Sequence, residues 1–322
     1  MSLAIEARDL TKYYGDFLAV DHINFDVEVG EIFGFLGPNG AGKSTTIRML
    51  TGISLPSAGT AKILGYDIVR NPVEAQALMG IVPDISNIYT ALTAWQNLDF
   101  TGKLYGIPRD KREEKNRELL ERFELYERKD DKVEDFSRGM RRKVCIAMAL
   151  VNDSKVLYLD EPTSGLDVKS VRSIRDLVRS LNEEGLTVFL TTHNMEEANS
   201  MCDRIAIINR GKVAAIDTPE KLKGAMRRSQ VIELSIEGND HDLTQIQDMN
   251  GVIEVQKRGD KYRIRTSSPK ETLRALCGLI ENEDLNVVSL NTLGSSLEDA
   301  FMELTGMEMQ KETIKGKGRR KR

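Results

Sequence analysis

Nine consecutive residues near the start of the chain carry the glycines and side chains that a phosphate-binding loop requires. The segment GPNGAGKST follows the apolar stretch IFGFL and precedes TIRML, which has helical character. Glycines let backbone N–H groups turn inward around phosphate oxygens, and the positive end of the following helix points at the same anion. We expect Lys43 to reach the β- and γ-phosphates and Ser44 to bind Mg²⁺. The predicted nucleotide site comprises Gly37, Pro38, Asn39, Gly40, Ala41, Gly42, Lys43, Ser44 and Thr45.

Two acidic residues and a histidine supply the second part of the expected chemistry. Asp160 and Glu161 end the apolar stretch KVLYL, and His193 ends a second apolar stretch, LTVFLTT. Asp160 can hold Mg²⁺ directly or through water, and Glu161 can polarise a water molecule that attacks the γ-phosphate. Because both stretches are expected to be strands of one sheet, His193 is placed to touch the γ-phosphate as well. Lys43, Glu161 and His193 are therefore the candidate catalytic residues.

The segment FSRGMRRKV, residues 136–144, concentrates basic side chains beside a serine and a glycine. Short basic runs are typical of phosphate patches in nucleic-acid-binding proteins, but a solvated helix face has the same composition. Ser137 is also a favourable N-cap for the apolar helix expected to follow, whose positive end attracts anions. From the residues alone these interpretations remain open.

The composition of the 322-residue chain is that of an ordinary globular protein, with 40% hydrophobic and 30% charged residues. No stretch approaches the roughly 18 consecutive apolar residues of a membrane helix, and the N-terminus lacks the apolar core of a signal peptide. The net charge is −4 although residues 311–322 contribute +6, which leaves about −10 for the rest and disfavours general nucleic-acid binding. Widely spaced Cys145, Cys202 and Cys277 predict buried, reduced thiols and no zinc site or disulfide.

Alternating strand-like and helix-like segments must position these residues. From residue 43 to about residue 217, short apolar stretches alternate with amphipathic ones. This order predicts a mostly parallel sheet that is covered on both faces. Residues 86–132 depart from it because they are highly charged, helical in pattern and without a convincing strand. We interpret them as a helical insertion.

A second domain is expected after a boundary near Arg227. Residues 230–292 follow the order strand, helix, strand, strand, helix and strand, which is that of a ferredoxin-like split βαβ unit. The segment SLEDAFMELTG has the apolar spacing of one more amphipathic helix, from Leu297 to Leu304. This domain carries no chemical motif, so we expect an interaction or regulatory role, with its own copy in a dimer as the first candidate partner.

The ordered motifs GPNGAGKST, FSRGM, YLDEP, SGLD and TTH make residues 3–220 similar to the nucleotide-binding subunits of ABC transporters. The remaining domain resembles the C-terminal extension of ABC-2 type exporters, which include drug-resistance ATPases. The resemblance implies an α/β fold: a P-loop NTPase of ABC type with an antiparallel β subdomain and a helical insertion, then a small α+β ferredoxin-like domain. The expected domains are residues 1–226, with a helical subdomain at about 86–150, residues 227–306, and a basic tail of residues 307–322.

In this family the signature segment of one subunit covers the ATP held by the phosphate loop of the other. The resemblance therefore implies that FSRGMRRKV meets a partner's nucleotide, with Ser137 and Gly139 at its γ-phosphate. Arg138 stands where the family has a second glycine, and it would either add charge at the γ-phosphate or point to solvent. Met140 replaces the family's glutamine. The other bases of the run are expected to be surface or partner contacts, namely Arg141, Arg142 and Lys143.

Three further roles are implied by the resemblance. Tyr14 matches the aromatic residue that stacks on adenine, with the adjacent Tyr13 as an alternative. Asp84 stands where the family has a glutamine; its carboxylate would meet Mg²⁺, but it would repel a γ-phosphate unless the metal screens it. Asp167 would lie across the seam between two subunits.

The resemblance thus implies an ATP-hydrolysing subunit, two copies of which enclose two Mg·ATP and drive a separate membrane permease, for export, from the cytoplasmic face of the membrane. The basic tail is expected to be disordered or to contact anionic lipid. The competing class is a soluble ABC-type ATPase that acts on nucleic acid or ribosomes, which only this tail favours. We expect no nucleic-acid partner, because the chain has one phosphate loop and no sustained heptads.

Overall fold

The computed structural model describes residues 2–85, 87–225, 230–237, 244–259, 261–283, 285–293 and 296–306. The chain divides into two compact units, Met1–Pro219 and Glu220–Arg322, a division close to the predicted boundary near Arg227. The predictions for the basic tail concern residues 307–322 and lie outside the described residues. Among the described residues, no helix is both long enough and apolar enough to cross a bilayer.

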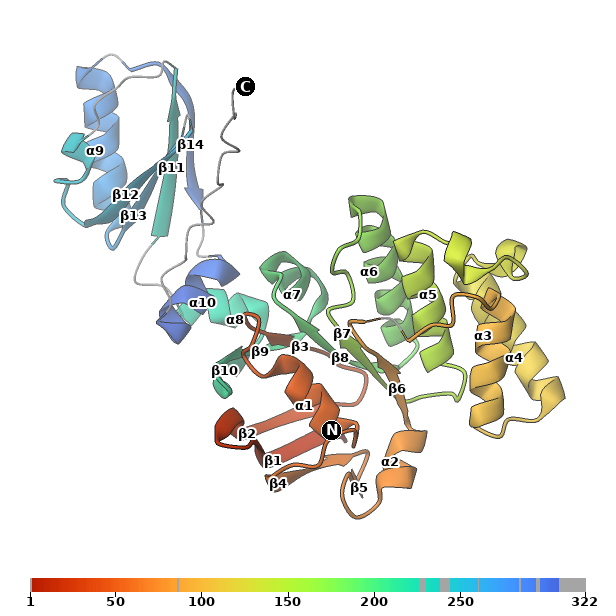
Figure 1. Ribbon diagram of the computed structural model, residues 1–322. Helices are drawn as coiled ribbons and strands as arrows, with labels where there is room; N and C mark the ends of the chain where they lie inside the picture. Colours follow the sequence, from red (N-terminus) through yellow and green to blue (C-terminus); the bar gives the residue numbers. More distant parts are fainter. Residues whose placement is uncertain are drawn as a thin grey trace, which may run out of the picture. The chain divides into compact units, whose positions relative to one another are not determined.

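Two sheets form the framework of the first unit (Figure 1). The larger has the order β10-β9-β3-β8-β7-β6, and its strands pair in parallel except where β10 pairs with β9. The smaller has the order β2-β1-β4-β5 and is antiparallel throughout. The strands are β1 Leu3–Tyr14, β2 Phe17–Glu28, β3 Ile32–Leu36, β4 Ala58–Ile63, β5 Tyr66–Asp67, β6 Met79–Val82, β7 Val156–Asp160, β8 Thr187–Thr192, β9 Arg204–Asn209 and β10 Lys212–Asp217.

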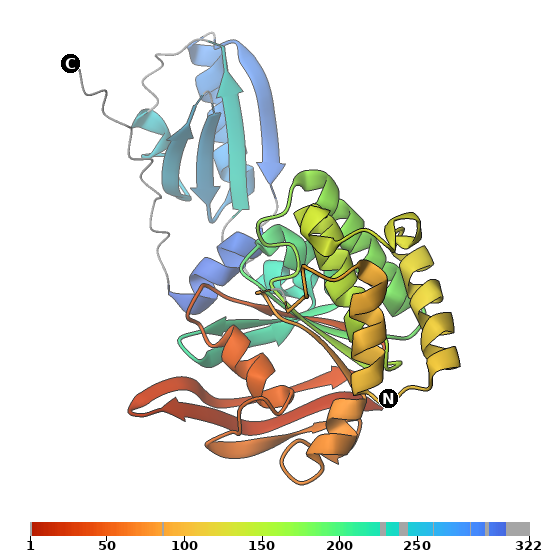
Figure 2. The ribbon, with the colours of Figure 1, turned by 45° about the vertical axis from the view of Figure 1, so that its right-hand side comes forward.

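The parallel sheet is covered on both faces, and its central strands are buried along their whole length. Every residue of β3, β7 and β8 is buried, which is typical of parallel strands with both faces covered. In Figures 1 and 2, α6 (Val168–Glu183) and α7 (Met195–Met201) lie on one face, and α1 (Lys43–Leu50) with the antiparallel sheet lies on the other. The short helix α2 (Pro72–Ala77) leads into β6. The prediction of a covered parallel sheet is confirmed.

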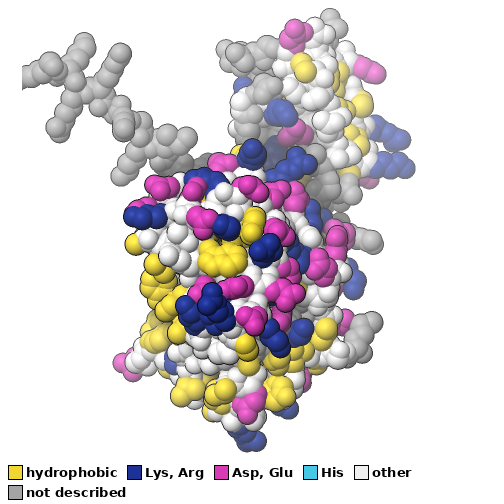
Figure 3. Space-filling view, turned by 90° about the vertical axis from the view of Figure 1, so that its right-hand side faces the viewer, with side chains coloured by type: hydrophobic (Ala, Val, Ile, Leu, Met, Phe, Trp, Pro, Cys, Tyr) yellow, Lys and Arg dark blue, Asp and Glu magenta, His cyan; other side chains and the backbone are white. Residues whose placement is uncertain are grey.

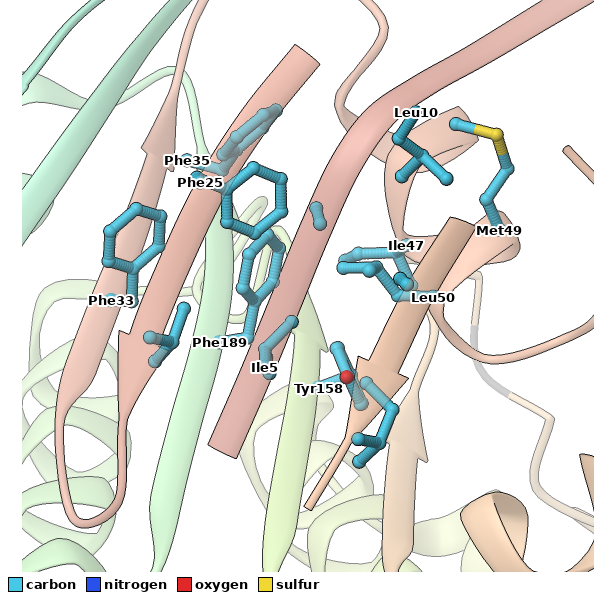
Figure 4. Close-up of a cluster of buried hydrophobic side chains, with 14 of the residues drawn as sticks. Ile5, Leu10, Phe25, Phe33, Phe35, Ile47, Met49, Leu50, Tyr158 and Phe189 are labelled. Atoms are coloured by element: carbon cyan, nitrogen blue, oxygen red, sulfur yellow. The ribbon is translucent and has the colours of Figure 1, made fainter. Parts of the chain in front are cut away.

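The core between the two sheets is built around phenylalanines (Figure 4). The rings of Phe25 and Phe33 stack with their centroids 5.7 Å apart, and the centroids of Phe35 and Phe189 are 5.5 Å apart. The buried apolar side chains of α1 belong to the same cluster. Because α1 is anchored in this core, the loop in front of it has a fixed position relative to both sheets.

The predicted helical insertion is present and contains α3 (Ala94–Leu104) and α4 (Arg109–Arg122). Two short 3₁₀ helices lead from α4 to α5 (Arg138–Ala149), which lies in the helical subdomain expected at about residues 86–150. Within residues 87–132, extended pairing is limited to an isolated bridge between Thr93 and Lys132. A capping box between Thr93 and Gln96 begins α3, and the backbone N–H of Trp95 donates to the carbonyl oxygen of Lys129 at 3.0 Å. The 3₁₀ helices are η1 Tyr126–Arg128 and η2 Val133–Asp135.

The second unit contains a four-stranded antiparallel sheet in the order β12-β13-β11-β14. This is the strand order of a split βαβ unit, but the described residues between β11 and β12 form only a 3₁₀ helix where we predicted a full helix. The ferredoxin-like classification therefore stays a prediction. The elements are α8 Pro219–Ala225, β11 Gln230–Ile236, η3 Thr244–Ile246, β12 Val252–Arg258, β13 Lys261–Thr266, α9 Pro269–Asn282, β14 Val287–Leu293 and α10 Leu297–Thr305.

In the second unit, the predicted amphipathic helix is present, but the prediction for the cysteine is wrong. The amphipathic helix is α10, which begins at a capping box between Ser296 and Asp299 and buries Leu297 and Phe301. Cys277 of α9 is exposed, so the prediction of a buried thiol is wrong there, whereas Cys145 and Cys202 of the first unit are buried as predicted. Helix α9 packs its apolar face on the sheet but leaves Cys277 outside that face.

Tyr158 is fully buried in β7, and its hydroxyl has no hydrogen-bond partner among the described residues. Its ring lies 5.6 Å from that of Phe189, within the core of Figure 4. Removal of an unsatisfied buried hydroxyl relieves its desolvation cost, so Tyr158→Phe is expected to stabilise the first unit by about 1 to 2 kcal/mol. Thermal denaturation followed by circular dichroism measures this. The same change at the exposed Tyr66 should be neutral, and a lower melting temperature for Tyr158→Phe would contradict the assignment.

Candidate functional site

The phosphate loop runs from the end of β3 to the first residue of α1 along a path that only glycine allows. Gly42 has a φ of 108°, a backbone conformation that L side chains rarely adopt. A Cβ atom on Gly42 would lie 2.7 Å from the carbonyl oxygen of Ala19, and one on Gly37 would lie 2.3 Å from that of Ile208. The loop is thus pressed against both sheets, and its backbone is fixed before any ligand arrives.

The ammonium group of Lys43 lies inside this loop and is almost completely buried. It donates to the carbonyl oxygens of Gly37 at 2.7 Å and Pro38 at 3.2 Å, and it lies 3.2 Å from Oε1 of Glu161. No side chain caps the N-terminus of α1 at this point. A buried cation beside an uncapped helix N-terminus attracts a multiply charged anion such as a triphosphate.

The acidic end of β7 adjoins the loop, as predicted. Asp160 is buried and accepts a short hydrogen bond from Oγ1 of Thr191 on β8. Glu161 has a φ of 48°, and its Oε2 lies 2.8 Å from Nδ1 of His193, whose side chain is half exposed. The structure therefore brings Lys43, Glu161 and His193 into one chain of contacts. Thr191 was not predicted, although a threonine at the end of a buried strand beside an aspartate is a usable signal.

These residues fit a magnesium nucleotide by the chemistry of their donors. Among the described residues, no group of three or more histidines, cysteines and acids can hold a metal by itself. Mg²⁺ normally takes one or two protein oxygens and completes its shell with water and substrate phosphates. The carboxylate of Asp160 and the hydroxyl of Ser44, in the first turn of α1, are protein oxygens of this kind. A metal here would arrive with the phosphates.

Ser137 is the N-cap of α5, as predicted, and its Oγ accepts from the backbone N–H of Met140 at 3.2 Å. Ser137 and Arg138 are both exposed. The guanidinium of Arg138 donates to the carbonyl oxygen of Gly165 at 3.3 Å, in the turn that precedes α6. The positive end of α5 thus faces outward with a hydroxyl and a guanidinium beside it, and the side chain of Arg138 reaches across to the SGLD turn.

Gly139 is required by close packing on α6. A Cβ atom at this position would lie 2.3 Å from Oγ of Ser170. Ser170 in turn donates to Asp167, through its backbone N–H at 3.0 Å and its hydroxyl at 2.6 Å. These hydrogen bonds lower the pKa of Asp167, which is the N-cap of α6. The signature segment and Asp167 therefore form one packed group within a single chain.

The prediction that Arg142 is a surface or partner contact is wrong. Its side chain is buried, and burial lowers the pKa of its guanidinium, while the charges of Asp84 and Asp160 oppose this shift. The guanidinium donates to the carbonyl oxygens of Pro162 at 3.0 Å and Pro83 at 2.6 Å. It also donates to those of Asp160 at 2.7 Å and Glu161 at 3.0 Å.

Arg141 and Lys143, the two neighbours of Arg142, instead contact residues in or just after the helical insertion. Arg141 donates to the carbonyl oxygens of Val133 at 3.1 Å and Glu134 at 2.5 Å. Lys143 forms an ion pair of 2.9 Å with the exposed Glu124. Helical spacing does not separate the three bases, because each of them lies three or four residues from buried positions of α5. The buried position of Arg142 therefore had no local signal in the sequence.

Tyr14 and Asp84 lie apart from the catalytic chain of contacts. Tyr13 and Tyr14 at the end of β1 are equally exposed, at 45%, and the ammonium group of Lys12 lies 5.3 Å from the ring centroid of Tyr14. Asp84 is exposed in the turn after β6. Within the described residues, neither Tyr14 nor Asp84 forms a hydrogen bond or ion pair with Lys43. Their roles at adenine and Mg²⁺ stay predictions.

Comparison with known proteins places these motifs in a family context. Residues 20–164 match the family described as ABC transporter. The linearmycin resistance ATP-binding protein LnrL of Bacillus subtilis is 37% identical over 95% of this chain and 99% of its own length. The daunorubicin/doxorubicin resistance ATP-binding protein DrrA of Streptomyces peucetius is 35% identical over 94% of this chain and 92% of its own length. Both relatives match across the two units of the chain.

A solved structure matches the fold of the first unit. The chain described as cbiO1 from Clostridium perfringens, part of the ABC transporter complex cbiONQ, superposes with a TM-score of 0.65 at 27% identity. The match covers 70% of this chain and 92% of that chain. The fold over this part of the chain is thus shared with a protein whose description also names an ABC transporter.

The contact between Gly139 and Ser170 generates a stability prediction. Gly139→Ala is expected to destabilise the first unit by about 1 to 3 kcal/mol through steric overlap, although alanine is the better helix former. In a Ser170→Gly background the same change should cost little, because both overlapping atoms are then absent. Circular dichroism melts of the single and double variants measure this. A Gly139→Ala variant that melts at or above the wild-type temperature would refute the packing argument.

Proposed function

The chain belongs to the ATP-binding subunits of ABC transporters, in the exporter branch, and we propose that two copies of it enclose two Mg·ATP and drive a separate membrane permease. ATP hydrolysis coupled to transport is the activity of this family, and the predicted family, ATPase fold and hydrolase activity are confirmed. The proposal adds the second copy, the metal, the permease and a peripheral position on the cytoplasmic face of the membrane.

The observation that carries the proposal is the contact chain Lys43–Glu161–His193 beside the phosphate loop. A γ-phosphate competes with Glu161 for the ammonium of Lys43, so the arrival of nucleotide frees Oε1 of Glu161. This oxygen is buried and has no other hydrogen-bond partner among the described residues. It can then accept the proton of the attacking water, while His193 holds the second carboxylate oxygen in place.

Four residues around the base complete the site. Thr191 orients Asp160, and Asp160 with Ser44 would hold Mg²⁺, which neutralises charge on the β- and γ-phosphates when it is bound. Lys43 and the N–H groups at the start of α1 hold the phosphates in line with the water. Phosphoryl transfer of this type depends on positioning and electrostatics, which the rigid loop supplies.

The outward-facing N-terminus of α5 supports a second copy as partner. Ser137 and Arg138 are exposed beside it, and Val168, next to Asp167, is 88% exposed at the start of α6. The phosphate loop of the same chain holds its own nucleotide around Lys43. An anion that meets the N-terminus of α5 would therefore come from another molecule. We assign Ser137, Gly139 and Asp167 to the partner's nucleotide, with Arg138 at the rim.

Apolar side chains exposed on the helical insertion support the permease as second partner. Figure 3 views the molecule from the side of α3 and α4 and shows hydrophobic side chains among charged ones on this face. Tyr89 and Phe100 form an edge-to-face pair with centroids 5.2 Å apart, and Leu104 is 71% exposed. Ile85, beside Asp84, is 85% exposed. A membrane subunit would cover this apolar surface, and the drug-resistance names of the relatives support export.

Removal of the loop cation tests the nucleotide site. In Lys43→Ala, ATP affinity is expected to fall about 10- to 100-fold, because charged hydrogen bonds to the phosphates are lost. Titration calorimetry measures the affinity, and a circular dichroism melt checks the fold. The matched control is Lys111→Ala on the exposed face of α4. Unchanged ATP affinity in Lys43→Ala would remove Lys43 from the site.

Replacement of the base tests hydrolysis and dimerisation together. In Glu161→Gln, the hydrolysis rate should fall by about 100- to 10,000-fold, because glutamine cannot accept the proton of water. Intact ATP then holds two chains together, so size-exclusion chromatography with Mg·ATP should show a dimer. ADP should not support this dimer, and Ser137→Arg in both copies should abolish it.

Two outcomes contradict this scheme in different ways. Hydrolysis by Glu161→Gln at the wild-type rate would mean that Glu161 is not the base. An inactive variant that elutes as the same species with ATP, with ADP and without nucleotide would leave the base in place but would refute the shared site.

A further inference from the structure

We infer that Arg142 is a positioning residue that ties helix α5 to the backbone after β6 and to the backbone after β7, where Glu161 lies, so that contact of Ser137 with a partner's nucleotide sets the position of Glu161 in the same chain. The inference rests on the proposed function, in which Ser137 and Glu161 serve two different nucleotides. It concerns a side chain that touches neither of them.

The guanidinium of Arg142 joins three segments that are distant in sequence. From α5 it reaches the carbonyl oxygen of Pro83 after β6 and three successive carbonyl oxygens, from Asp160 to Pro162, after β7. All four distances lie between 2.6 and 3.0 Å. A planar group with five N–H donors can serve four acceptors in this way, whereas a lysine ammonium has three donors around a single nitrogen.

The positive charge of Arg142 is balanced by dipoles and by acids at a distance. The charges of Asp84, Asp160 and Glu197 act favourably on it, and Glu197 is itself buried and accepts from Oγ1 of Thr163 at 2.7 Å. A buried guanidinium that bonds to carbonyl groups is costly to desolvate, so it is a poor means of simple stabilisation. Its arrangement is suited to fixing the direction of those carbonyls.

The turn that Arg142 holds is sensitive to such a contact. Glu161 has a φ of 48°, a conformation that non-glycine residues keep only when their surroundings enforce it. Its carbonyl oxygen accepts from Arg142 and its backbone N–H donates to the carbonyl oxygen of Thr191 at 3.1 Å. A shift of α5 therefore acts on the backbone from which the carboxylate of Glu161 projects. Arg141 makes no such link, because its bonds end at Val133 and Glu134.

The first test separates catalysis from binding in the full chain. Arg142→Met should lower kcat on the order of 100-fold, because a small displacement of a catalytic group has effects of this size. Arg142→Lys should lower it less, while the affinity for ATP, measured by calorimetry, stays within about threefold of wild type in both variants. Arg141→Met, one residue away and also bonded to carbonyls, is the matched control and should retain kcat.

The second test is a double-mutant cycle on kcat. If Arg142 transmits the contact made by Ser137, Ser137→Ala combined with Arg142→Met should lose little more than the larger single variant. Ser137→Ala combined with Arg141→Met should give the loss of Ser137→Ala alone. Additive losses in the first pair would overturn the transmission.

The remaining outcomes distinguish this inference from the proposed function. Wild-type kcat in Arg142→Met, with Glu161→Gln inactive, would overturn the inference and leave the function standing. Loss of ATP affinity together with kcat in both Arg142 variants would also overturn it, by showing a general role in folding. Wild-type turnover in Glu161→Gln would instead refute the proposed base before Arg142 is considered.

Discussion

The position of one buried ammonium group governs the site of this ATPase. Lys43 is held by the carbonyl oxygens of its own loop and by Glu161, so the loop, the end of β7 and the start of α1 must keep a fixed geometry. That geometry depends on glycines pressed against Ile208 and Ala19, and these depend on the phenylalanine core that locks the two sheets together. The geometry of the catalytic contacts therefore depends on side-chain packing in the hydrophobic core.

The parts of the site that lie in short, contiguous motifs were predictable from the sequence. A phosphate loop needs its glycines and its lysine in one short stretch, and mostly apolar runs mark β7, which ends at Asp160, and β8, which His193 follows. Arg142 was not predicted, because its acceptors lie 18 to 59 residues away and composition alone does not show which base of a run faces inward.

In the second unit, sequence patterning predicted the strands better than the helices. Alternation along β13 buries Tyr262 and Ile264 while Lys261 and Arg265 stay exposed, a period that only a sheet with one covered face produces. Between β11 and β12, the described residues form only the 3₁₀ helix η3 where we expected an α-helix. This segment is short and polar, so few apolar side chains are available to pack a longer helix against the sheet. Both drug-resistance relatives extend over this unit, which makes it part of the family's chain and leaves its partner as a proposal.

The contact between α3 and Lys129 also has a spectroscopic consequence. Trp95, whose backbone makes that contact, is the only tryptophan of the chain. Selectively excited indole emission therefore originates from the helical insertion alone, without an introduced dye and without signal from either sheet or from the second unit. The protein thus carries an intrinsic fluorophore on the helical subdomain, which also contains α5. Any movement of this subdomain that alters the surroundings of the indole can be followed in the unmodified chain.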